Sequence, residues 1–223
     1  MKSLIKNAAG RKIFMAVTGQ LMVLFIIIHV IGNSTIYFGV LNSYADHLHA
    51  VPFLLWVFRL VMLTVFLIHV LFGILLTLDN CSARPGSYAV RAYRQSTFAS
   101  RNMIWTGLLI CLFLFYHLLH FTFQIIRPEV SAGVNSDAMG RPDVFNMLVM
   151  NFQHFSVTLI YILAIVALVL HLSHGIQSSF QTLGLNNERT LPVITKGGSI
   201  VAYVLFFGYI AIPVMIFIGI LHG

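Results

Sequence analysis

Five long apolar segments dominate this chain of 223 residues and leave few folds open to it. Each is at least as long as the roughly 20 residues that an α-helix needs to cross the hydrocarbon core of a bilayer. The segments lie near residues 12–37, 53–78, 101–127, 146–181 and 196–221. Hydrophobic residues make up 59% of the chain and charged residues only 9%, unlike an ordinary soluble domain. The sequence therefore predicts an all-α integral membrane protein with five transmembrane helices in a single domain, residues 1–223.

Lysine and arginine gather in the connections on one side of these segments, the pattern of cytoplasmic loops. The predicted inner side carries Lys2, Lys6, Arg11, Lys12, Arg84, Arg91, Arg94, Arg101, Arg189 and Lys196. The loops of the other side carry only Arg127 and Arg141. We therefore predict a multi-pass protein with its N-terminus in the cytoplasm. This bias accounts for the net charge of +7, so nucleic acid is not an expected partner.

Four of the segments each contain a histidine, and an imidazole in hydrocarbon needs a partner. With about 1.5 Å of rise per helical residue, His29 and His117 are expected near the outer face, and His69 and His171 near the inner face. We call them the outer pair and the inner pair. The fourth segment is so long that His171 falls about 37 Å along it, which predicts a protruding helix.

Small residues around the histidines repeat the same pairing. A Thr-Gly dipeptide, Thr18-Gly19 or Thr106-Gly107, stands ten residues before each histidine of the outer pair and at the depth of the inner pair. A glycine, Gly73 or Gly175, follows each histidine of the inner pair by four residues, on the same helix face. Glycine leaves room for a flat ligand, and two imidazoles fill both axial positions of a haem iron. The first four helices are therefore predicted to hold two haems that relay electrons, with the fifth packed outside.

Two further polar side chains, Arg59 and Tyr161, fall at the depth of the outer pair. Each stands ten residues before a histidine of the inner pair. Arg59 is a candidate contact for a haem propionate, and the alternative is that it snorkels to the outer interface. Tyr161 either lines the same site or serves packing.

Two more histidines, His120 and His174, compete with the predicted ligands. They follow His117 and His171 by three residues and share their helix faces. The glycine spacing favours His117 and His171 as the metal ligands. His120 and His174 then either support a ligand or contact a propionate, or are plain interfacial histidines.

Taken together, these residues resemble the di-haem cytochrome b membrane subunit of bacterial succinate:quinone oxidoreductases and quinol:fumarate reductases, in its five-helix, single-anchor form. The resemblance covers nearly the whole chain and rests on the order and spacing of several short motifs. They are Phe25-Ile26-Ile27-Ile28-His29 with Asn33, Pro52-Phe53, Ile68-His69 with Gly73, Thr106-Gly107 leading to Tyr116-His117, and His171-Leu172-Ser173-His174-Gly175. In that family the first and third histidines hold the distal haem, and the second and fourth hold the proximal haem.

The resemblance implies a membrane anchor and electron-transfer subunit in the bacterial inner membrane, with two haem b groups and menaquinone as the quinone. An oxygen of that quinone is then a second candidate contact for Arg59. A flavoprotein subunit and an iron–sulfur subunit would dock on its cytoplasmic face, and the dicarboxylate chemistry would belong to the flavoprotein. Arg84, Arg91 and Arg94 form a candidate docking loop, unless they serve lipid headgroups. Some menaquinol-oxidising members place a glutamate two residues before the fourth-helix histidine. Here that residue is Val169, so a carboxylate proton path is not implied.

Three other interpretations stay open at this point. A di-haem cytochrome b anchoring a hydrogenase or a formate dehydrogenase also carries histidines on several helices, although the helix order and spacing argue against it. The His117/His120 and His171/His174 pairs suggest a histidine-box non-haem metalloenzyme, which needs its ligands at one depth rather than two. A proton-conducting transporter without haem is the third. The sequence contains no glycine-rich phosphate loop and no nucleophile elbow, the motifs of phosphoryl transfer and hydrolysis.

Overall fold

The computed structural model describes residues 7–83 and 97–222, which fold into helices and loops. In these residues there is no β-strand, only an isolated bridge between Ser136 and Pro142. Five helices of the described chain are long and apolar enough to cross a membrane. They are α2 (Ala8–Asn33), α4 (Pro52–Ser82), α6 (Met103–His117), α8 (Phe155–Thr182) and α9 (Thr190–Phe217). The predicted all-α membrane protein with five spans is confirmed.

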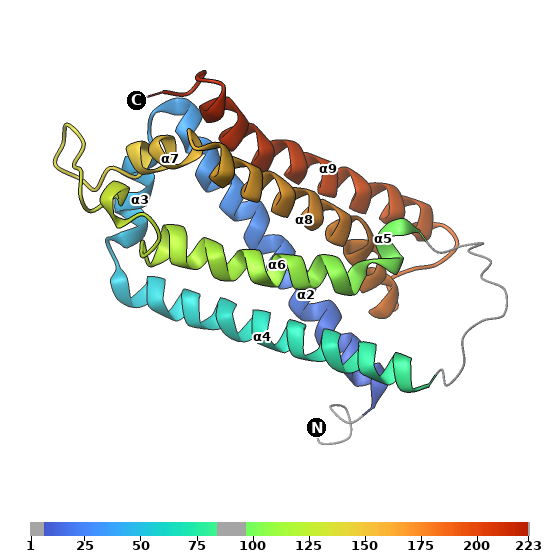
Figure 1. Ribbon diagram of the computed structural model, residues 1–223. Helices are drawn as coiled ribbons and strands as arrows, with labels where there is room; N and C mark the ends of the chain where they lie inside the picture. The colour runs from blue at the N-terminus through green and yellow to red at the C-terminus, as the bar shows by residue number, and fades with distance from the viewer. Residues whose placement is uncertain (1–6, 84–96, 223) are drawn as a thin grey trace.

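The helices α2, α4, α6 and α8 form a bundle, which Figure 1 shows from the side. Helix α2 packs along α4 on one side and α8 on the other, and α6 packs along α8. The ring closes loosely, because α4 and α6 touch much less than the other neighbours. In this order α2 stands diagonally across from α6, and α4 diagonally across from α8. At the N-terminal end of the bundle, an ion pair of 2.6 Å between Arg11 and Asp79 joins α2 to α4.

Helix α9 lies outside this four-helix core, as predicted. It packs mainly along α8 and also reaches α2. Ala202, Leu205 and Ile216 are buried in these contacts. At Gly208 the approach to α2 is close, since a Cβ atom there would lie 3.0 Å from Val30. The fifth helix therefore supports α8 and α2 without entering the bundle axis.

The prediction of one long fourth helix over residues 146–181 is wrong. The segment forms two helices, α7 (Val144–Phe152) and α8, separated by Gln153 and His154. The polar side chains at this break compete with the helical ladder: Asn151 donates to the Met147 carbonyl (2.9 Å), and the Thr158 hydroxyl donates to the Phe152 carbonyl (2.5 Å). His171 consequently lies about 24 Å from the start of its helix instead of 37 Å, close to the roughly 26 Å of His69 in α4.

The third span also ends earlier than its predicted boundary at residue 127. A short helix, α5 (Phe98–Arg101), precedes α6, and a π-helical turn, η2 (Leu118–Thr122), follows it. Beyond the turn, Gln124 and Arg127 adopt left-handed backbone conformations with φ of 53° and 56°. Such conformations are strained for residues with a side chain. They turn the chain sharply out of the span, where the sequence pattern alone continues the helix.

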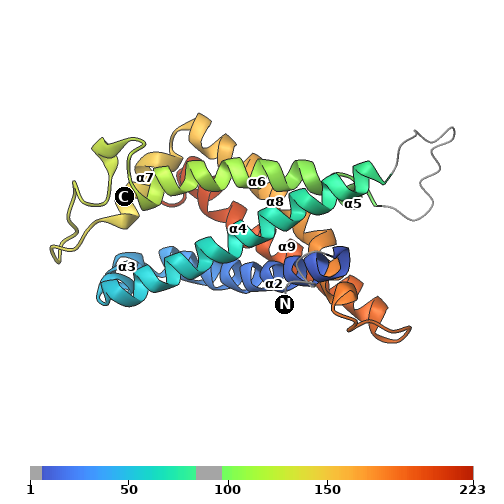
Figure 2. The ribbon, with the colours of Figure 1, turned by 90° about the horizontal axis from the view of Figure 1, so that it is seen from below.

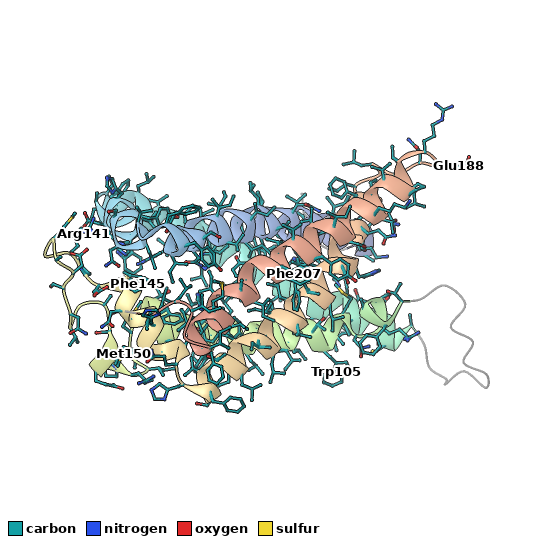
Figure 3. The ribbon with its side chains drawn as sticks, turned by 90° about the horizontal axis from the view of Figure 1, so that it is seen from above. Trp105, Arg141, Phe145, Met150, Glu188 and Phe207 are labelled. Carbon is teal, nitrogen blue, oxygen red and sulfur yellow. The ribbon has the colours of Figure 1, made fainter. Side chains whose placement is uncertain are left out.

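Short elements close the C-terminal end of the bundle. They are η1 (Ser34–Phe38), α3 (Leu41–His49), η3 (Pro128–Val130) and α7. Figure 2 shows α3 and α7 at one end, beside the C-terminus, and α5 at the other. Figure 3 places Arg141, Phe145 and Met150 at this C-terminal end and Glu188 at the opposite end. The Arg141 guanidinium ties the closing loop to α3 by donating to Ser43. The two ends of the bundle are thus built differently.

Candidate functional site

The four predicted ligands meet as two pairs inside the bundle. The ring centroids of His29 and His117 are 6.1 Å apart, and those of His69 and His171 are 6.4 Å apart. In each pair the two histidines come from diagonally opposite helices of the bundle: His29 from α2 and His117 from α6, and His69 from α4 and His171 from α8. Each pair therefore spans the bundle axis.

The two pairs lie at different levels of the bundle. Gly19 of α2 packs against His69, since a Cβ atom at this glycine would lie 3.2 Å from the imidazole Cε1. Gly107 of α6 packs against His171 in the same way, at 3.3 Å. Because Gly19 precedes His29 by ten residues on one helix, the two levels are about 15 Å apart. Both glycines make room for the imidazoles of the inner pair.

The other two glycines of the sequence pattern border open space. A Cβ atom at Gly73 would meet only the Met15 sulfur, at 4.0 Å, and one at Gly175 only the Met103 methyl group, at 3.9 Å. Methionine is flexible and yields easily to a ligand. One helical turn beyond each histidine of the inner pair, the helix surface can therefore accept a flat group.

Hydrogen bonds fix which nitrogen of His69 carries the proton. Its Nδ1 lies 3.1 Å from the Met15 carbonyl oxygen and 3.3 Å from the Thr18 hydroxyl. A carbonyl oxygen only accepts, so Nδ1 is the protonated nitrogen. The Thr18 hydroxyl donates to the Phe14 carbonyl (2.7 Å) and accepts from the imidazole. Nε2 of His69 therefore keeps a free lone pair, the state that a metal ligand requires.

His171 repeats this arrangement on the other half of the bundle. Its Nδ1 lies 3.2 Å from the Thr106 hydroxyl, and the Met103 backbone is a further hydrogen-bond partner of the ring. Thr106 lies within 3.1 Å of the carbonyls of Asn102 and Met103, as Thr18 lies near those three and four residues before it. The pair α6–α8 thus repeats the contacts of the pair α2–α4. The sequence indicated the repeat through the Thr-Gly dipeptides but not that the threonine contacts an imidazole.

The outer pair has a different set of partners. Nδ1 of His117 lies 3.2 Å from the Tyr161 hydroxyl, which also lies 3.2 Å from Nδ1 of His120. Nε2 of His120 lies 2.9 Å from the side-chain oxygen of Asn151. Protein groups therefore occupy both nitrogens of His120, whereas Nε2 of His117 has no partner in the described part of the chain. The ring of His29 makes no hydrogen bond to any described residue, so its lone pair is also available.

Asn151 belongs to this site although the sequence analysis does not single it out. It is 2% exposed, and its carbonyl oxygen also accepts from the Arg127 guanidinium (3.3 Å). A buried asparagine within an apolar run is the feature that marks it in the sequence. The contact between Asn151 and His120 depends on the helix break before α8, and the hydrophobic pattern does not predict that break.

The remaining predicted contacts have fewer partners. Arg59 of α4 is half-buried, with its guanidinium 5.2 Å from the centre of the Trp56 ring, and forms no ion pair with a described residue. His174 of α8 is half-buried and makes no hydrogen bond within the described part of the chain. The candidate docking loop with Arg84, Arg91 and Arg94 lies outside the described residues.

Both pairs fit a haem iron. With metal–imidazole bonds of about 2.0–2.1 Å, two facing imidazoles that share one metal ion have ring centres about 6 Å apart. The observed 6.1 and 6.4 Å agree with that separation. A histidine-box centre needs more protein ligands at one place, and the described residues contain no group of three or more His, Cys, Asp or Glu side chains arranged for a metal ion. Two imidazoles at each level are the number that a haem takes.

Comparison with known proteins identifies the class of protein. A family model for the succinate dehydrogenase/fumarate reductase transmembrane subunit matches residues 82–207, more than half of the chain. The matched region contains His117 and His171 and the helices that carry them. No curated protein and no solved structure matches the chain. Members of the family anchor the flavoprotein and iron–sulfur subunits of a quinone-linked oxidoreductase complex in the membrane. The chain belongs to the succinate dehydrogenase/fumarate reductase transmembrane subunit family.

Proposed function

We propose that this chain passes electrons between a membrane quinone and the iron–sulfur subunit of its complex by means of two bis-histidine b haems. The observation that carries the proposal is the pair of imidazole separations, 6.1 and 6.4 Å, at two levels of the bundle. His29 and His117 would hold the outer haem, and His69 and His171 the inner one. A haem with two imidazole ligands supplies one-electron transfer and has no open position for oxygen chemistry.

The protein's own contribution is to hold the ligating imidazoles with their Nε2 lone pairs free for a metal ion, in apolar surroundings. At the inner pair the Met15 carbonyl and the Thr18 hydroxyl hold the proton of His69 on Nδ1, and the Thr106 hydroxyl holds that of His171. These bonds fix the ring orientation and raise the basicity of the ligating nitrogen. The apolar helices around the rings exclude water.

We place the quinone contact near the outer pair, with menaquinone as the quinone. Arg59 and Tyr161 lie on the two helices that carry the inner pair, each ten residues before its histidine and so at the level of the outer pair. The Arg59 guanidinium lacks an ion-pair partner among the described residues, which suits it to a quinone oxygen or a haem carboxylate. The iron–sulfur and flavoprotein subunits would dock at the N-terminal end, on the cytoplasmic side of a bacterial inner membrane.

The proposal is tested by spectroscopy of the purified membrane complex. We expect a b-type α-band in the dithionite-reduced minus oxidised spectrum and two haems for each copy of this chain. Replacing His29 or His69 by alanine should remove one haem in each case. His47→Ala is the matched control, because this exposed imidazole of α3 bonds only to its own helix, at the Ser43 carbonyl. A purified complex with no b-type band, or with two haems left in the His29→Ala variant, would rule out the assignment.

A further inference from the structure

A buried line of polar groups connects the outer pair to the C-terminal end of the bundle. It runs from His117 through Tyr161, His120 and Asn151 to Arg127, with successive separations of 3.2, 3.2, 2.9 and 3.3 Å. Tyr161 is 6% exposed and His120 only 2%. Buried polar groups are stabilising only when each has a partner, and here each does.

The direction of every hydrogen bond in this line follows from the end formed by Arg127 and Asn151. The Asn151 amide donates to the Met147 carbonyl, so the asparagine oxygen accepts from both Arg127 and His120. Neutral His120 then has its proton on Nε2 and accepts at Nδ1 from the Tyr161 hydroxyl. The tyrosine oxygen in turn accepts from His117.

These directions determine the tautomer of His117. Its proton is held on Nδ1, which leaves the Nε2 lone pair for the interior of the outer pair. At the inner pair the Met15 carbonyl does the same for His69, and no side-chain substitution removes it. His117 has no such carbonyl partner among the described residues, so its tautomer depends on the Tyr161 side chain.

The surroundings of Tyr161 hold it in place. Its ring packs edge-on against Phe113 and Phe152, each with a centroid separation of 4.9 Å. The ring of His120 stacks on Phe121 at 4.1 Å, within the π-helical turn η2. Strained backbone at Arg127 brings its guanidinium back to Asn151. Strained turns of this kind concentrate at functional sites.

We infer that Tyr161, held by His120 and Asn151, is a positioning residue that fixes the tautomer of His117 and tunes the redox potential of the outer haem alone. The inference rests on the proposed function of His117 as an axial ligand. A hydrogen bond from Nδ1–H to the tyrosine oxygen makes the imidazole a stronger donor and so favours the oxidised metal. Loss of the hydroxyl therefore raises the midpoint potential of the outer component.

The test compares two tyrosines that flank the same pair. Tyr161→Phe removes one oxygen atom and should raise the midpoint potential of one haem component in an optical redox titration of the whole complex, leaving the other unchanged. Tyr209→Phe is the matched control: its ring lies 6.2 Å from that of His29, but its hydroxyl donates to the Ile26 carbonyl at 2.6 Å. The control should shift neither component.

A double-substitution cycle tests whether His120 acts through Tyr161. His120→Leu should shift the same component in the same direction as Tyr161→Phe, and the two changes together should shift it no further than Tyr161→Phe does alone. If His120→Leu does not assemble, the two tyrosine variants still decide the matter. Unchanged potentials in Tyr161→Phe, or an equal shift in Tyr209→Phe, would overturn the inference while both haems remain present. Absence of haem from the parent complex would overturn the proposed function and the inference with it.

Discussion

At the inner pair the two histidines are supported in the same way, whereas at the outer pair each has its own surroundings. Backbone carbonyls and the hydroxyls of Thr18 and Thr106 hold the inner rings, and a glycine seats each of them. At the outer pair His117 relies on Tyr161, whereas the ring of His29 packs against Phe25 and Tyr209 and has no hydrogen-bond partner among the described residues. The ring separations are nevertheless within a few tenths of an ångström. The separation of the two imidazoles is thus common to both levels, whereas the groups that contact the imidazoles differ.

The difference arises within an internal repeat. The pair α2–α4 and the pair α6–α8 carry the same threonine, glycine and histidine positions, which accounts for the matched support of the inner pair. Ten residues before the inner histidine, however, α4 carries Arg59 and α8 carries Tyr161. One half of the repeat brings a charge to the outer level and the other a hydroxyl. We attribute the asymmetry of the outer pair to this one position.

The largest expected effect comes from filling the space that Gly19 and Gly107 leave for the imidazoles of the inner pair. In Gly19→Leu or Gly107→Leu, the new side chain occupies the space of the imidazole 3.2 or 3.3 Å away. We expect loss of the inner haem signal and retention of the outer one, measured as haem per chain and as the number of redox components. Gly197→Leu in α9 is the control, because a Cβ there meets nothing within 4 Å. Loss of the outer signal instead would contradict the assignment of these glycines.

A smaller shift is expected from Arg59, the charge that distinguishes the two halves. The ring of its neighbour Phe58 contacts Phe25, which in turn contacts His29. A nearby positive charge favours the reduced metal, so Arg59→Gln should lower the midpoint potential of the outer component by roughly tens of millivolts. Arg59→Lys keeps the charge and should keep most of the potential. A shift confined to the inner component would contradict the position of Arg59 at the level of the outer pair.

The threonines of the inner pair test whether its two halves are equivalent. Thr18→Val and Thr106→Val each remove one acceptor from an imidazole Nδ1–H, while the backbone carbonyl remains. A hydrogen bond worth ~0.5–1.5 kcal/mol corresponds to a rise of about 20–60 mV in a one-electron potential. The two variants should shift the inner component by similar amounts, as read by redox titration. Clearly unequal shifts would show that the repeat does not extend to the energetics.

The smallest effect concerns the loop that closes the C-terminal end, beyond the outer pair. Side-chain and backbone hydrogen bonds from Arg141, with ion pairing, lower the pKa of Asp137 from 3.8 to about 2. Because the folded pKa is depressed, this contribution to loop stability is complete above about pH 4 and is lost as the pH falls toward 2. The protection of residues 131–143 against hydrogen exchange, relative to the intrinsic exchange rate at each pH, should therefore fall across that window. Asp137→Asn should lack the pH step, and an identical pH profile in both proteins would refute the role of this carboxylate.

Much of the fold was predictable from the sequence, because long apolar runs define spans and helix length relates residue number to depth. The five spans and the outer position of α9 follow from that relation. The break between α7 and α8 does not, since Met147, Val149 and Phe152 continue the apolar pattern while side-chain hydrogen bonds end the helix. The early end of the third span is likewise set by the left-handed backbone at Gln124 and Arg127, which neither residue type predicts.

The candidate site divides in the same way. The spacing of histidines and glycines predicts which four imidazoles face one another in two pairs, because helical periodicity fixes their faces and depths. The partners of those imidazoles depend on rotamers and on contacts between helices distant in sequence. Asn151 meets His120 only because the chain turns at Gln153, and sequence spacing contains no record of that turn.

The central claim is that the outer and inner pairs are two separate bis-histidine sites. It is tested most directly by redox titration of the four single variants His29→Ala, His117→Ala, His69→Ala and His171→Ala in the intact complex. We predict that the first two variants lose one and the same redox component and that the last two lose the other. Loss of the same component from His29→Ala and His69→Ala, whose histidines lie on the adjacent helices α2 and α4, would contradict the account.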